Sequence, residues 1–131
     1  MEVKNHWYYF LHITKVLGVD ENTEEEVTVS INNVEFVAFI AYAPYVIEIG
    51  KEYLTKISLF VDDIRLFENS SENRQLIREG DSFNYFVRGY LNKNGQLDVG
   101  FMIEDDLFQD SQYLYGKFVC FKVDRISLKF L

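Results

Sequence analysis

Short segments with an apolar residue at every second position constrain this chain more than any other feature of its sequence. Residues 27–31 and 34–42 show the pattern first, and residues 83–91 and 117–123 repeat it. Side chains alternate between the two faces of a β-strand, so a period of two buries one face of each strand. The pattern therefore predicts an all-β protein in which each strand contributes one face to a core.

The clearest local prediction is a β-hairpin whose turn is formed by Asn32 and Asn33. A two-residue hairpin turn needs positive φ angles, which asparagine tolerates better than most residues. The register that pairs Ile31 with Val34 keeps the apolar side chains of both strands on one face. Turn and pattern thus indicate the same hairpin.

A second hairpin is predicted around a three-residue loop that ends at Gly95, which can supply the left-handed residue of the turn. Its register pairs Leu91 with Leu97 and, further along, Tyr85 with Ile103. Two long, regular strands are therefore expected on either side of this loop.

The apolar parity of two segments changes partway along, at Asp62-Asp63 and again at Asp124-Arg125. Such a slip is typical of a β-bulge or a sharp bend. Bent strands favour curling of the sheet, which also removes exposed edges. We therefore expect a small, partly closed barrel of five or six strands, with a two-sheet β-sandwich as the alternative.

Two parts of the chain are less regular. Residues 7–17 fit either a strand or a short helix, and one helical turn is expected around Arg74 to Arg78 or within residues 105–116. Across residues 26–131, the order of hairpins, bent strand and closing strand resembles the OB-fold and related small barrels. The resemblance implies a binding scaffold that can hold a single nucleic-acid strand.

Length and charge limit the organisation and the partners. The 131 residues suit one domain over residues 1–131, with residues 1–25 as an N-terminal extension and acidic loop. The chain has 21 acidic and 13 basic residues, a net charge of −8. This charge repels nucleic-acid phosphates and favours basic partners.

Cys120 is the only cysteine, so no disulfide can form within the chain. It lies between Val119 and Phe121 in an apolar run, and we expect it to be a small buried hydrophobe. No segment approaches the roughly 20 apolar residues of a membrane-spanning helix. A reducing, cytoplasmic location without membrane contact is the expectation.

Catalytic motifs are lacking in the sequence, which has neither a phosphate-binding glycine loop nor a zinc-binding histidine motif. We therefore expect a protein that is not an enzyme and uses no cofactor or metal. Carboxylates at Asp62-Asp63 and at residues 104–106 offer the one alternative, a hydrolase that holds a divalent cation through oxygen ligands. Adjacent acids at strand ends more often form turns.

Nucleic-acid binding is a second alternative, because aromatic and basic residues alternate on the predicted outer face of two strands. Bases stack on aromatic rings while basic side chains contact phosphates. The segment from residue 117 to the end adds three lysines, Lys117, Lys122 and Lys129, and Arg125. The candidate residues are Lys56, Phe60, Phe86, Arg88 and Tyr90.

Recognition of a basic protein is the function that the composition favours. Tyrosines supply large contact areas with one polar tip, and acidic residues guide the encounter. The candidate residues are Tyr42, Tyr45, Asp105, Asp106, Tyr113 and Tyr115. In size, charge and β pattern the chain resembles small acidic bacterial proteins of unassigned role, among them immunity proteins, which implies a cationic toxin as partner. Self-association through an exposed strand is the remaining alternative.

Overall fold

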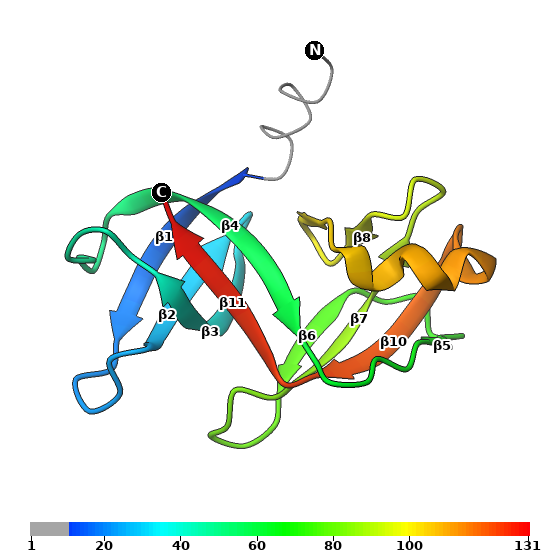
Figure 1. Cartoon of the computed structure of the whole chain (residues 1–131), viewed down its shortest axis with the longest axis horizontal. Coiled ribbons are helices and arrows are strands. Elements are labelled where there is room, and N and C mark those ends of the chain that lie inside the picture. The colour runs from blue at the N-terminus through cyan, green and yellow to red at the C-terminus, as the bar shows by residue number, and fades with distance from the viewer. Residues whose placement is uncertain (1–10) are drawn as a thin grey trace, which may run out of the picture.

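The computed structural model describes residues 11–131, whose strands form two sheets (Figure 1). This arrangement confirms the predicted all-β class. The first sheet contains β1 (Leu11–Val19), β2 (Glu26–Ile31), β3 (Val34–Tyr42), β4 (Glu52–Phe60) and β11 (Arg125–Phe130). The second contains β5 (Phe67–Glu68), β6 (Gln75–Arg78), β7 (Tyr85–Leu91), β8 (Leu97–Asp98), β9 (Met102–Ile103) and β10 (Lys117–Val123).

The first sheet closes on itself as a barrel of five strands in the order β1-β2-β3-β11-β4. All neighbours are antiparallel except β3 and β11, which run parallel. Residues 7–17 were expected to form either a strand or a short helix, and from Leu11 onward they form a strand, β1. Residues 7–10 lie outside the described residues. A closed ring of five strands is present, as expected for a small barrel, but its membership differs from the prediction. The strands on either side of Gly95 and the strand at residues 117–123 were expected in the barrel and belong to the second, six-stranded sheet.

The predicted Asn-Asn hairpin forms between β2 and β3. Asn32 and Asn33 have φ angles of 50° and 66°, and the register pairs Ile31 with Val34. Inward side chains such as Val29 are fully buried. The prediction from turn chemistry and apolar pattern is confirmed.

The changes of apolar parity mark the places where the chain passes from one sheet to the other. β4 ends at Phe60 and the chain continues to β5, while β10 passes into β11 through Asp124 alone. The two connections between the sheets, after β4 and between β10 and β11, are in contact. The Asp124 amide donates a hydrogen bond of 2.8 Å to the Phe60 carbonyl. The bulge predicted at Asp124-Arg125 is therefore a change of sheet.

The second hairpin follows its predicted register only near its loop. Leu91 pairs with Leu97, and Gly95 has a φ of 78°. The predicted pairing of Tyr85 with Ile103 is wrong, because the chain turns back at Gly100, with a φ of 108°, and Ile103 pairs with Leu97 instead. Over most of its length β7 pairs instead with β6 on one edge and with β10 on the other.

The two helical expectations have opposite outcomes. The turn expected around Arg74 to Arg78 is wrong, because Gln75 to Arg78 form β6 and pair with β7. The turn expected within residues 105–116 is confirmed as a 3₁₀ helix, η1 (Asp106–Leu114). Among residues 11–131, no helix is long and apolar enough to cross a membrane.

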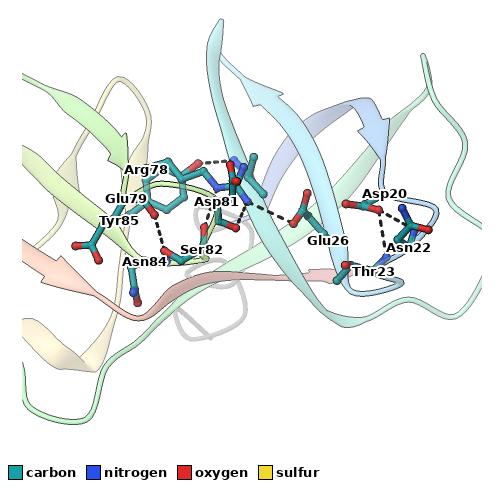
Figure 2. A network of polar contacts seen from close by, with 11 residues as sticks. Asp20, Asn22, Thr23, Glu26, Arg78, Glu79, Asp81, Ser82, Asn84 and Tyr85 are labelled. Carbon is teal, nitrogen blue, oxygen red and sulfur yellow. Dashed lines mark hydrogen bonds and ion pairs between the residues drawn. The ribbon is translucent and has the colours of Figure 1, made fainter.

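One continuous core joins the barrel to the second sheet. The ring of Phe36 on β3 stacks on Phe101 with 5.7 Å between centroids. Arg78 on β6 also reaches Glu26 of β2 at 3.4 Å, and donates hydrogen bonds to the carbonyls of Asp81 and Ser82 in the loop that follows β6 (Figure 2). The packing and polar contacts hold the two sheets together.

Candidate protein-binding surface

An exposed apolar surface lies on the barrel, over the outer side of β1 and β4, the 43–51 loop and the C-terminal residue. Val46 is 83% exposed and Ile13 65%, values that are unusual for large apolar side chains. Ile13 and Leu54 are direct cross-strand neighbours. We call this surface the barrel patch, and it comprises Ile13, Tyr45, Val46, Leu54 and Leu131.

Hydrogen bonds hold the barrel patch in place. The Tyr45 hydroxyl donates to the Leu131 carbonyl at 2.7 Å, and the Leu131 amide donates to the Leu54 carbonyl at 3.0 Å. The Tyr45 ring stacks on Tyr53, with centroids 5.3 Å apart, and the Tyr53 hydroxyl accepts from the Glu48 amide. Partial burial raises the pKa of Tyr45, and Tyr53 raises it further, which keeps the donating hydroxyl protonated.

A shallow cleft of about 490 Å³ lies between Tyr45, Val46, Leu54 and Leu131. Its polar border is formed by Glu48, Lys51 and Glu52. Lys51 forms an ion pair of 2.7 Å with Glu48, and this hydrogen bond raises the Lys51 pKa. With one cation and two carboxylates, the border keeps a net negative charge.

The tyrosines predicted to bind a protein are divided between two regions. Tyr42 and Tyr45 lie at and after the end of β3, on the barrel, and both are exposed. Tyr113 is exposed on η1, beside the second sheet. Tyr115 has a structural role, since its hydroxyl donates to the Phe108 carbonyl at 3.0 Å and its ring packs against Gly95.

The two predicted aspartates also differ from one another. Asp105 caps η1 by accepting from the Leu107 amide at 3.1 Å, and its other oxygen accepts from the Leu59 amide of β4 at 2.9 Å. Asp106 is exposed and accepts a hydrogen bond from Gln109. Asp105 therefore fixes the helix to the barrel, and Asp106 remains at the surface.

The nucleic-acid candidates separate in the same way. Phe86, Arg88 and Tyr90 share the outer face of β7 in the second sheet. Lys56 and Phe60 lie on the outer face of β4 in the barrel. The structure therefore does not bring the predicted set together as one surface.

Cys120 is half-buried, which corrects the prediction of full burial. Its neighbours Val119 and Phe121 face the core, so alternation places Cys120 on the outer face of β10. Among the described residues, no group of three or more histidine, cysteine, aspartate or glutamate residues is placed to hold a metal ion.

Sequence reasoning found Tyr45 and missed the aliphatic members of the barrel patch. A signal was present in β4, where Ile57 and Leu59 define the core parity and Leu54 lies on the opposite parity. Ile13 is likewise out of phase with buried Val16. An apolar residue on the outward parity of a strand marks an exposed hydrophobic position.

A five-stranded barrel joined to a second sheet defines the class as an all-β protein, and this one has an exposed apolar patch on its barrel. Comparison with protein families matches residues 10–131 to the family described as "Uncharacterised conserved protein UCP019853", and the chain belongs to this family. No curated protein and no solved structure matches the chain.

Proposed function

We propose that this protein is a non-enzymatic binding module that recognises a basic protein through the barrel patch. The observation that carries the proposal is the concentration of exposed apolar side chains around Val46, Leu54 and Leu131. Contiguous apolar patches bordered by polar residues mark interaction sites in soluble proteins. The hydrogen bonds of Tyr45 and Tyr53 preorganise the patch, which lowers the entropy lost on binding.

Charge favours a basic partner. The patch is bordered by Glu48 and Glu52. Elsewhere on the barrel, the loop between β1 and β2 carries four acidic residues, at positions 20, 21, 24 and 25. The whole chain has a net charge of −8. Opposite charge accelerates encounter and selects against acidic partners. A cationic toxin neutralised by an immunity protein would have this chemistry, and the lone cysteine suits a reducing cytoplasm.

The acidic residues of the barrel also argue against the alternative function, binding of an oligonucleotide to the barrel as in an OB-fold. OB-folds bind oligonucleotides with the face of their second and third strands and with the loop after the first. In this chain the corresponding loop carries the four acidic residues at positions 20–25, and β2 is engaged through Glu26 by Arg78 of the second sheet. A phosphate backbone would meet repulsion there.

The proposal is tested by capture from lysate of the source cell, comparing the wild-type protein with the variants Val46→Asp and Leu54→Asp, both of which change exposed residues of the patch. Phe86→Asp on the second sheet is the control, since Phe86 is also exposed. We expect a protein of basic isoelectric point that the wild type and the control retain and that both patch variants lose. The partner is then purified, and its affinity is expected to fall about tenfold or more from low to high salt.

Three results would refute the proposal: no protein retained, retention unaffected by the patch variants, or a purified partner whose affinity does not change with salt. A further measurement addresses the self-association alternative. If sedimentation shows a wild-type dimer that Val46→Asp dissociates, a second copy occupies the patch and the basic-partner proposal is wrong.

A further inference from the structure

A second concave site lies on the outer face of the second sheet and shares no lining residue with the barrel patch. Its volume is about 390 Å³, within the roughly 300–1,000 Å³ typical of small-molecule sites. The residues that matter for its chemistry are Arg65, Phe67, Phe86, Arg88, Cys120 and Lys122. The proposed protein interface does not account for this cleft.

The cleft exists because a small side chain occupies the middle of a row of large ones. Across β5, β10 and β7, the register places Phe67 beside Cys120 and Cys120 beside Arg88. In the next row, Lys122 lies beside Phe86. Side chains of paired residues stand on the same face of a sheet, so Cys120 forms a floor between higher walls.

Apolar rings form two of the walls. Phe67 is 60% exposed and Phe86 is 42% exposed, and both line the cleft. The Lys122 ammonium lies 5.5 Å from the centre of the Phe86 ring. Exposed rings on both sides of a narrow floor favour a flat, apolar body, because ring faces are buried by stacking.

The charges of the cleft favour a single negative charge on the ligand. Arg65 forms an ion pair of 3.3 Å with Asp63, and Lys122 forms one of 3.0 Å with Glu79. Within residues 11–131, Arg88 forms no ion pair, and its guanidinium donates to the Gln75 side-chain oxygen at 3.2 Å. The Arg88 guanidinium therefore has no carboxylate partner, and its planar set of N–H donors matches the geometry of a carboxylate.

We propose that this cleft binds a small aromatic carboxylate, with the ring of the ligand against Phe67 and Phe86 and its carboxylate on Arg88. This inference goes beyond the proposed function, because it concerns a small ligand on the other sheet. A negative result for the ligand cleft would not contradict the proposed role of the barrel patch. A negative result for the barrel patch would likewise not contradict the ligand cleft.

The test compares naphthoate with its neutral isostere, naphthamide, by calorimetric titration of the full chain. We expect saturable naphthoate binding and about tenfold or more weaker naphthamide binding, because only the acid forms a charge-assisted hydrogen bond. Arg88→Gln removes this preference. Arg74→Gln is the matched control, since Arg74 is ion-paired with Asp98 and lies outside the cleft, and we expect its affinity within about twofold of wild type.

Cys120 provides a second measurement that needs no variant. Saturating naphthoate is expected to slow alkylation of the Cys120 thiol by iodoacetamide, and Cys120→Leu is expected to abolish binding by filling the floor. The proposal is overturned if naphthoate does not bind saturably up to about 10 mM. It is also overturned if acid and amide bind equally, if Arg74→Gln weakens binding as much as Arg88→Gln, or if alkylation is not slowed. A mononucleotide that binds more tightly than naphthoate would show that the assigned ligand class is wrong.

Discussion

Tyr85 links the two sheets, and its removal provides a quantitative test of how strongly they are coupled. The ring of Tyr85, which Figure 2 labels, is 3% exposed on β7. Its hydroxyl accepts a hydrogen bond of 2.7 Å from the Val37 amide on β3. Tyr85→Phe removes this acceptor and keeps the packed ring. A buried donor left without its partner costs about 1–3 kcal/mol, and for this partly buried hydrogen bond we expect about 2 kcal/mol. For a domain of 131 residues that is a fall in Tm of about 7 °C.

The pH dependence of this effect has a definite sign. Burial is the main cause that raises the Tyr85 pKa above its ordinary value of 10.0, with the charge of Glu26 adding to it, while the hydrogen bond from Val37 and the charge of Arg78 lower it. A raised folded-state pKa means that the folded protein holds the proton more tightly. The resulting stability is fully present below pH 10.0 and is lost as the pH rises through the folded-state pKa. The difference in stability between the wild type and Tyr85→Phe should therefore shrink above that pH.

Urea unfolding followed by circular dichroism, at neutral pH and again above pH 10.0, measures both effects. Tyr113→Phe is the control, because Tyr113 is 73% exposed, and its stability should stay within about 0.5 kcal/mol of wild type. A loss below about 0.5 kcal/mol for Tyr85→Phe at neutral pH would refute the coupling between the sheets. A difference that grows with rising pH would refute the sign of the linkage.

Two further predictions concern local structure. Asp105→Ala should cost about 1–3 kcal/mol in urea unfolding, because two backbone amides lose their acceptor, whereas Asp106→Ala should stay within about 0.5 kcal/mol; equal effects would contradict the structural role of Asp105. Gly100→Ala should lower the free energy of unfolding by about 3 kcal/mol and Gly50→Ala by about 1 kcal/mol. Both glycines have a positive φ, but of the two only Gly100 would place a Cβ 2.7 Å from a side chain, that of Val34. A reversed order in thermal melts would contradict the packing at Gly100.

Local chemistry made part of the fold predictable. The Asn32-Asn33 hairpin follows from two residues that accept positive φ and from strands whose register buries one face. The return of the chain at Gly100 was not visible in the pattern, since apolar residues continue with the same period through Ile103. The strand at residues 75–78 was missed because the segment around it, residues 69–80, is mostly polar, and pairing with β7 decides its conformation.

The binding surfaces were less predictable than the fold, because each depends on pairings between distant segments. Tyr45 was identified from residue type alone, but its neighbours Leu54 and Leu131 come together only when β4 and the C-terminus meet. Cys120 was assigned to the core by its apolar neighbours. Its place on the outer face follows from the parity of β10, which Val119 and Phe121 already defined.

The crossing between the sheets also determines how the two proposed sites should behave together. At the crossing, the Arg125 guanidinium carbon lies 4.1 Å from the centre of the Phe39 ring and 4.4 Å from that of Phe60, so residues of β3, β4 and β11 pack against each other. Such cation–π contacts, each worth about 0.5–2 kcal/mol, stabilise the barrel side of the crossing. The two sites lie on different sheets and share no lining residue, so a ligand at one makes no direct contact with the other. We therefore expect naphthoate to leave the affinity of the barrel patch for its partner unchanged within about 0.5 kcal/mol. A larger change, measured by titrating the partner with and without saturating naphthoate, would show that the sheets move relative to each other.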